Sequence, residues 1–176
     1  MLACMELLDP EPCSDCLYHR TIFRHRPPLG PALTLWWPCR ITDALPEVVI
    51  LFIPGKYYFS KCSRYSFIDP GNPGLVDLYS SFLSAIREMD RSGRMSIYAH
   101  AHIGHSPGLE SICQDTQRSN FLFTQIQGVL EIFDALKVSF PSARIILVGH
   151  SVGAWIALQV RRFSLERGLY TCRVMT

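Results

Sequence analysis

The sequence has little excess charge of either sign. Its 176 residues include 17 Lys and Arg and 15 Asp and Glu, and no run of five like charges occurs. Binding to phosphate backbones needs clustered basic residues, so this balance excludes an electrostatic nucleic-acid binder. A hydrophobic fraction of 48% also excludes a disordered chain. The length therefore predicts one globular domain that buries its own core.

The sequence also lacks a long apolar run. The longest stretch, residues 145–160, is interrupted by His150 and Ser151 and is too short for a membrane span of about 20 residues. The first residues show no basic region followed by an apolar segment, so we predict no signal peptide. Seven cysteines form no framework spacing, and we expect reduced thiols.

One pair of cysteines has a spacing that metal sites use. Cys13 and Cys16 are followed by His19, but no second ligand pair is present. Because structural zinc sites need four ligands, we predict neither a metal nor another cofactor.

Apolar patterns typical of strands and of helices alternate along the chain, which predicts an α/β fold. Continuous β-branched and aromatic runs are typical of strands buried on both faces of a parallel sheet. We expect strands over residues 33–37, 48–53, 95–99 and 144–148. Amphipathic helices are expected from residue 75 to the turn at Ser92 and Gly93, over residues 126–136, and over residues 154–163. Short strand–helix–strand connections favour right-handed crossovers.

The chain divides into three predicted parts. Residues 1–47 are rich in Pro and Cys and contain one probable strand. Residues 48–163 form the core of alternating strands and helices, and residues 164–176 form an atypical tail in which the alternation is lost.

Residues 149–153 read G-H-S-V-G, which matches the nucleophile-elbow pattern between a predicted strand and a predicted helix. In that interpretation Ser151 presents its hydroxyl above the sheet, and the backbones pass closely at Gly149 and Gly153. The amide of Val152 would donate to a developing oxyanion. The alternative is a plain helix N-cap serine between two glycines.

Residues 70–74 read P-G-N-P-G and directly precede the helix predicted at Leu75. An oxyanion hole needs a second backbone N–H from an earlier loop. Since Pro73 has no N–H, the expected donor is the amide of Asn72, with Gly71 and Gly74 as structural glycines. The alternative is a Gly/Pro turn that only ends one element before the next begins.

Four segments together resemble the lipid droplet-associated hydrolase family of α/β-hydrolases, over roughly residues 45–162. They are F-I-P-G at residues 52–55, the P-G-N-P-G loop, A-H-I-G-H-S at residues 101–106 and the elbow. The resemblance implies the N-terminal half of an α/β-hydrolase fold, a mostly parallel sheet with helices on both faces. It also implies hydrolysis of neutral lipid esters, such as sterol or acylglycerol esters, at the surface of lipid droplets and the endoplasmic reticulum.

By the same resemblance Ser151 is the nucleophile. We expect the acyl chain to lie over an apolar face near Trp155, Leu75 and Tyr79, with His150 as a further pocket candidate.

The sequence departs from the family pattern in its first motif. The family runs from strand to loop as F-I-P-G-N-P-G, whereas residues 56–69 separate the two halves here. This insertion would form a surface loop or displace Asn72 from Ser151. Because Gly55-Lys56-Tyr57 is what a read-through splice donor could encode, we hypothesise a retained intron.

The second departure concerns the triad, whose order in α/β-hydrolases is Ser, then Asp or Glu, then His. The 25 residues after Ser151 include Glu166 but no histidine, and all six histidines precede it. The simplest interpretation is a truncated product of a longer hydrolase, whose last strand, 144–148, has no neighbour and leaves an apolar patch exposed. Impaired ester hydrolysis and an inactive lipid-associated or interaction protein both remain open, as does transfer to another acyl acceptor.

His100, His102 and His105 lie at the end of a predicted strand. They are interpreted as metal ligands, as pocket lining or, preferably, as part of a solvated polar loop, since no carboxylate or cysteine joins them at a fixed spacing. His105 as a substitute base for Ser151 is a further alternative.

Overall fold

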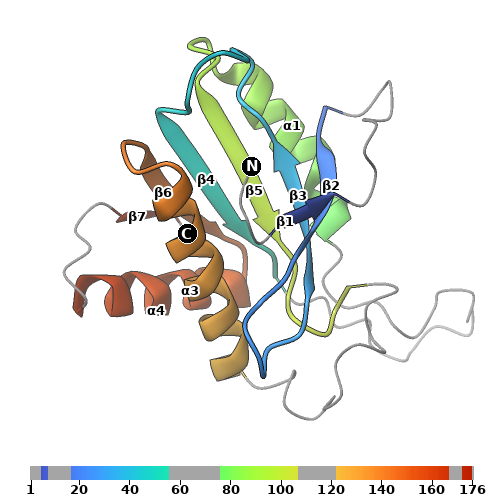
Figure 1. Cartoon of the computed structure of the whole chain (residues 1–176), viewed down its shortest axis with the longest axis vertical. Helices are drawn as coiled ribbons and strands as arrows, with labels where there is room; N and C mark the ends of the chain where they lie inside the picture. The colour runs from blue at the N-terminus through green and yellow to red at the C-terminus, as the bar shows by residue number, and fades with distance from the viewer. Residues whose placement is uncertain (1–4, 8–16, 56–75, 107–121, 167–171, 176) are drawn as a thin grey trace, which may run out of the picture.

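The computed structural model describes residues 5–7, 17–55, 76–106, 122–166 and 172–175, which form one sheet and the helices against it (Figure 1). The seven strands stand in the order β1-β2-β3-β5-β4-β6-β7. Their bounds are Met5–Leu7 (β1), His19–Phe23 (β2), Ala32–Trp37 (β3), Val48–Ile53 (β4), Met95–His100 (β5), Arg144–Gly149 (β6) and Cys172–Met175 (β7). The helices are the 3₁₀ turn η1 (Val76–Tyr79), α1 (Ser80–Met89), α3 (Leu122–Ser139) and α4 (Val152–Glu166).

The sheet is parallel in its central and C-terminal part. β4 pairs in parallel with β5 and β6, and β6 with β7. β1, β2 and β3 are joined by antiparallel ladders, and β3 runs antiparallel to β5. The expected α/β class is therefore confirmed, and part of the N-terminal segment extends the same sheet.

One expectation about the end of the chain is wrong. β7 pairs with β6 from Ile145↔Cys172 to Val148↔Met175, so the strand over residues 144–149 has a neighbour on both sides. The tail therefore continues the strand–helix alternation. The pattern was missed because β7 spans four residues, one of them Arg173.

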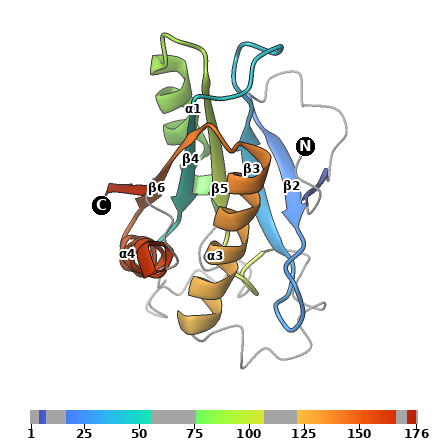
Figure 2. The ribbon, with the colours of Figure 1, turned by 60° about the vertical axis from the view of Figure 1, so that its left-hand side comes forward.

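Apolar side chains of β4 alternate between two cores, one on each face of the sheet. Val49, Leu51 and Ile53 pack with buried residues of α3 and α4. Ile50 and Phe52 pack on the opposite face with Leu83 of α1. Figure 2 shows the same separation, with α1 behind the sheet and α3 and α4 in front of it. The continuous apolar run thus reflects burial on both faces.

The first helix presents a different face to the core from the one that the sequence predicts. It begins with η1, and Leu78 and Phe82, which the helical spacing of apolar residues from Leu75 places on the apolar face, are 59% and 53% exposed. A 3₁₀ turn has three residues per turn, so it shifts the apolar face relative to a regular α-helix. In α3 the predicted apolar positions are buried, as expected: Ile126, Val129, Leu130, Phe133 and Leu136.

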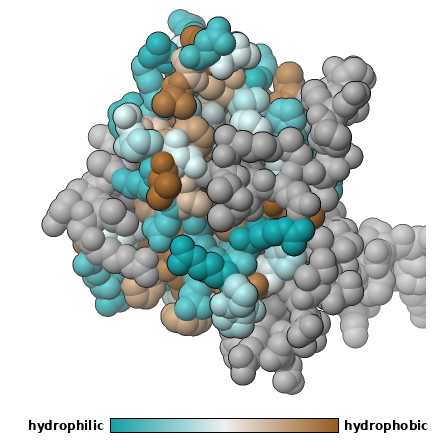
Figure 3. Space-filling model, viewed as in Figure 1, coloured by the Kyte–Doolittle hydropathy of each residue, from teal (hydrophilic) through white to brown (hydrophobic). Residues whose placement is uncertain are grey.

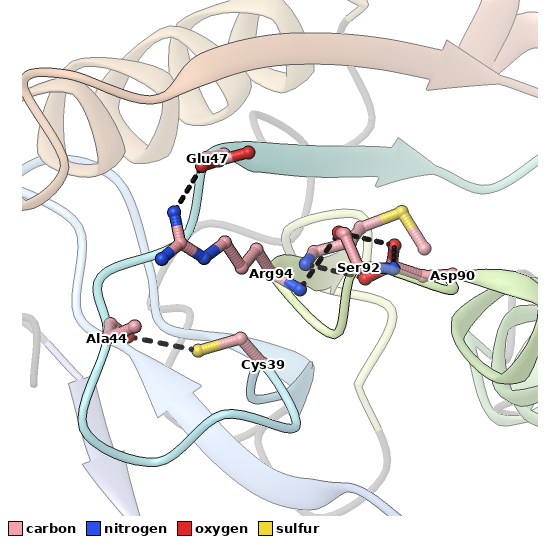
Figure 4. Close-up of polar contacts among 7 residues, drawn as sticks. Cys39, Ala44, Glu47, Asp90, Ser92 and Arg94 are labelled. Carbon is pink, nitrogen blue, oxygen red and sulfur yellow. Dashed lines mark hydrogen bonds and ion pairs between the residues drawn. The ribbon is translucent and has the colours of Figure 1, made fainter.

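A polar cluster closes the turn between α1 and β5 (Figure 4). The Asp90 carboxylate accepts hydrogen bonds from the hydroxyl and backbone N–H of Ser92, at 2.7 and 3.0 Å, and from the N–H of Met95 at 2.9 Å. Partial burial by itself raises the pKa of Asp90, but these hydrogen bonds outweigh it and hold the pKa below its usual value. Next to this turn, Arg94 forms an ion pair with Glu47 ahead of β4.

The histidines after β5 are not in a solvated loop. His100, His102 and His105 are 2%, 5% and 8% exposed, so the preferred interpretation is wrong. Each imidazole makes a hydrogen bond: His100 Nδ1 lies 3.1 Å from the Thr34 hydroxyl, His102 Nε2 lies 2.9 Å from the Pro54 carbonyl oxygen, and His105 Nδ1 lies 3.0 Å from the Ile103 carbonyl oxygen. These bonds satisfy ring nitrogens that burial removes from water.

Burial also shifts the titration of two histidines. Burial, together with the charges of His25 and His102, holds the pKa of His100 well below its usual value. Burial likewise lowers the pKa of His25, although its bond to Glu131, 3.0 Å, opposes the shift.

Replacement of Asp90 should destabilise the fold in a pH-dependent way. At pH 7 we expect Asp90→Ala to lower the free energy of unfolding by about 1–2 kcal/mol, since three donors lose their acceptor. A carboxylate with a lowered folded pKa contributes stability above its unfolded pKa of about 3.9, and this contribution is lost as the pH falls through the folded value. Urea unfolding at pH 7 and pH 3 measures both effects. The exposed Asp43→Ala is the control and should change little at either pH.

Stability should fall as the pH drops below about 6.5, because the unfolded chain then binds a proton that the buried His100 does not. The slope for one histidine is about 1.4 kcal/mol per pH unit. His100→Asn keeps a hydrogen-bonding group beside Thr34 and should flatten this slope between pH 6.5 and pH 5, leaving the part due to His25. An unchanged slope in urea unfolding of this variant would contradict the assignment.

Candidate active site

Ser151 lies on the sharp turn that joins β6 to α4. Its φ is 55°, and it is the one non-glycine residue with a positive φ in the described part of the chain. β6 ends at Gly149 and α4 begins at Val152, so Ser151 stands outside the helix and its side chain is exposed. A left-handed serine costs about 1–2 kcal/mol relative to a right-handed one. Such local strain is a feature of functional turns.

The glycines of this turn are required by close backbone contacts. A Cβ at Gly153 would lie 2.2 Å from the carbonyl oxygen of Ile53, at the end of β4. A Cβ at Gly149 would lie 2.4 Å from the carbonyl oxygen of Gly153. Neither contact can be relieved by rotating a side chain, so a larger residue at either place would push the strand and the helix apart.

Gly55, two residues after the end of β4, is a further site residue, which the sequence indicates only as the last glycine of the F-I-P-G motif. A Cβ there would lie 2.6 Å from Nδ1 of His150 and 3.0 Å from Cβ of Ser151. The sequence signal for Gly55 as a site residue is its position one residue after Pro54, which follows a buried strand. The N–H of His150 also donates to the Ile53 carbonyl oxygen at 3.1 Å, which ties the turn to the end of β4.

Two of the four pocket candidates are in contact. The Tyr79 hydroxyl of η1 lies 2.9 Å from Nδ1 of His150, and the N–H of Gly55 donates to the same hydroxyl at 3.3 Å. Trp155 lies one helical turn after Ser151 and is 44% exposed. The fourth candidate, Leu75, lies outside the described residues, as do Gly71, Asn72 and Gly74.

The start of α4 directs backbone N–H groups toward the turn. Gly153 N–H donates to the His150 carbonyl oxygen at 2.9 Å, and Ala154 N–H donates to that of Ser151 at 3.0 Å. The N–H of Val152 is the first of the helix, and first-turn N–H groups have no intrahelical acceptor. With the positive end of the helix dipole, this amide favours negative charge beside Ser151.

Within the described part of the chain, no side chain hydrogen-bonds to the Ser151 hydroxyl. His150, His102 and His105 instead bond to Tyr79, Pro54 and Ile103, respectively. Among the residues that the structure describes, the geometry therefore presents an exposed hydroxyl beside an amide donor, without a base bonded to it.

Among the same described residues, no three His, Cys, Asp or Glu side chains converge as metal ligands. Cys13 and Cys16 are not among them, and His19 begins β2. No described helix is both long and apolar enough to span a bilayer.

A family model described as lipid-droplet associated hydrolase matches residues 62–175, more than half of the chain. The lipid droplet-associated hydrolase of Mus musculus is 31% identical over 123 residues, which are 63% of this chain and 36% of that protein. That of Drosophila melanogaster is 30% identical over 101 residues, 51% of this chain and 30% of that protein. The chain thus spans about a third of the length of these relatives.

Solved structures share the fold at low sequence identity. An alpha-beta serine hydrolase homologue from Coxiella burnetii matches with a TM-score of 0.52 and 12% identity, over 83% of this chain and 57% of that one. A thermostable carboxyl esterase from Bacillus coagulans matches with a TM-score of 0.53 and 13% identity, over 89% of this chain and 43% of that one. The fold is part of an α/β-hydrolase fold, and by its family match the chain belongs to the lipid-droplet associated hydrolases.

Proposed function

We propose that this chain carries the nucleophile half of a serine ester hydrolase for neutral lipids, such as sterol or acylglycerol esters. The observation that carries the proposal is the left-handed φ of 55° at Ser151, between a buried parallel strand and a helix. That conformation lifts a serine hydroxyl above the sheet, as a nucleophile elbow does. The names of the relatives in Mus musculus and Drosophila melanogaster support a lipid as the substrate.

In the proposed reaction, the Ser151 oxygen attacks the ester carbonyl carbon and gives up its proton to water. The tetrahedral intermediate then breaks its bond to the ester oxygen and releases the alcohol, which takes up a proton, and water cleaves the acyl-serine to release the fatty acid and restore the Ser151 hydroxyl. The N–H of Val152 stabilises the oxyanion of the tetrahedral intermediate, and the N–H of Asn72 is the proposed second donor. Gly149 and Gly153 allow the close approach on which the turn depends, and Gly71 and Gly74 are the proposed structural glycines beside Asn72 in the sequence. The reaction requires no metal and no cofactor.

We place the protein at the surface of lipid droplets, or of the endoplasmic reticulum, as a peripheral protein without a nucleic-acid partner. Exposed apolar side chains support contact with lipid, among them Trp155 and Leu158 on α4, which are 44% and 45% exposed. Figure 3 shows apolar side chains as separate brown patches among polar ones on the face viewed. Contact through separate side chains fits shallow, reversible attachment.

Turnover by these 176 residues is expected to be slow. A serine hydroxyl is a weak nucleophile at neutral pH without an adjacent base, and the residues after Ser151 contain no histidine. Loss of a triad member still leaves about 10³-fold rate acceleration over water from the remaining groups.

The rival function is a catalytically inactive lipid-associated or interaction protein. It is favoured by one observation: in the described part of the chain the Ser151 hydroxyl has no histidine bonded to it. The rival and the esterase differ in the reactivity of one hydroxyl, which can be measured directly.

Ser151→Ala should abolish labelling by a lipid-like fluorophosphonate, because the reagent forms its bond to the serine oxygen. The experiment compares the native 176-residue chain, this variant and Ser142→Ala, which removes an exposed serine from the turn before β6. We expect labelling of the native chain and of Ser142→Ala. Absence of labelling in all three, with retained binding to triacylglycerol emulsions, would support the inactive rival.

Gly55→Ala should slow the same labelling about 10- to 100-fold, since the new methyl group would displace His150 and the turn by a fraction of an ångström. Gly93→Ala is the matched control. Gly93 has a positive φ of 67° in the turn before β5, so its replacement also strains the backbone but leaves the turn at Ser151 unchanged. Equal labelling rates for the two variants at equal folded fractions would refute this role for Gly55.

A further inference from the structure

We propose that Tyr79 is a positioning residue of the candidate site, and that its hydroxyl holds the backbone after β4 against the turn that carries Ser151. The proposal rests on the proposed function of Ser151, and it gives Tyr79 a role beyond that of a pocket candidate. Its basis is the convergence of Gly55, Tyr79 and His150 on one oxygen atom.

Two hydrogen bonds meet at the Tyr79 hydroxyl. Its oxygen accepts from the N–H of Gly55 at 3.3 Å, and it lies 2.9 Å from Nδ1 of His150, as donor or acceptor according to the tautomer of the imidazole. A phenol can take part in both bonds at once. The hydroxyl thus joins two backbone segments that are far apart in the sequence.

Packing holds the Tyr79 ring in place. Its centroid lies 4.7 Å from that of Phe52 in β4 and 5.8 Å from that of His150. Phe52 is buried in the core between the sheet and α1, so the ring stands on a rigid base. Tyr79 itself ends η1, which begins four residues after Asn72 in the sequence.

The position of the Tyr79 hydroxyl matters for catalysis because oxyanion donors must be placed accurately. Oxyanion donors work at about 2.7–3.1 Å, and a misplacement of 1 Å costs about 10²-fold in rate. The turn at Ser151 supplies one donor, and Asn72, outside the described residues, is the proposed source of the other. The Tyr79 hydroxyl is bonded to Gly55 after β4 and to His150 beside Ser151, so it sets the separation between the end of β4 and the turn that carries the Val152 donor.

The first test is Tyr79→Phe in the whole chain, which removes the hydroxyl and retains the ring packed on Phe52. We expect the maximal rate of fluorophosphonate labelling at Ser151 to fall about 10-fold, with the half-saturating reagent concentration unchanged. Tyr18→Phe is the control, because the Tyr18 hydroxyl makes no hydrogen bond in the described part of the chain and its ring packs 4.8 Å from Trp37. A wild-type rate for Tyr79→Phe would overturn the proposal.

A double-mutant cycle with His150→Ala tests whether the two side chains act as one unit. If they do, the double variant labels about as slowly as either single variant. If the two effects multiply, the proposed link between Tyr79 and His150 is refuted.

A measurement without the reagent separates this proposal from the function of Ser151. With ¹⁵N-glycine, Tyr79→Phe should shift the amide resonance of Gly55 and raise its hydrogen-exchange rate at least 10-fold, while Tyr18→Phe leaves both unchanged. If the native chain fails to label, the proposed function fails, and the Gly55 amide alone decides the positioning role. An unchanged Gly55 amide in Tyr79→Phe overturns that role whatever the labelling shows.

Discussion

The close approach of two backbones at the end of β4 is the constraint on which the candidate site depends. The Ile53 carbonyl oxygen accepts the N–H of His150, and it lies 2.2 Å from where a Cβ of residue 153 would stand. The start of α4 can occupy this place because Gly153 has no side chain. Ser151, one residue before the helix, then takes a left-handed conformation. Burial of Ile156 and Val160 stabilises the packing of α4 on the sheet and offsets the backbone strain at Ser151.

The two ends of the parallel strands serve different purposes. At the amino ends, Asp90 and the ion pair of Arg94 with Glu47 close the connections and stabilise the fold. At the carboxyl ends, the segments after β4, β5 and β6 meet, although they lie far apart in the sequence. His102 contributes there by its bond to the Pro54 carbonyl oxygen, a structural use of a histidine close to the candidate site. Crevices at this edge are where α/β sheets bind their ligands.

The sequence predicted those elements whose signal is local. β4 is a continuous apolar run, and the turn at Ser151 has a glycine two residues before and two residues after the serine. Both elements are therefore predicted by their own segment of sequence. β2 and β7 were missed because each is short, contains an arginine and is defined by the strand it pairs with. The predicted apolar face of the first helix is wrong for a different reason. This helix begins with the 3₁₀ turn η1, and apolar spacing does not distinguish three residues per turn from 3.6 over so short a segment.

Sequence alone determined the α/β class and the position of the serine turn, because apolar periodicity and glycine placement express contacts within one segment. The resemblance of four motifs to a known family indicated the family, which the family match confirms. Tertiary structure alone decided that the histidines after β5 are buried and that Gly55, Tyr79 and His150 meet at one hydroxyl. These contacts join residues up to 71 positions apart. Their formation depends on how the strands are ordered in the sheet, and no short stretch of sequence records that order.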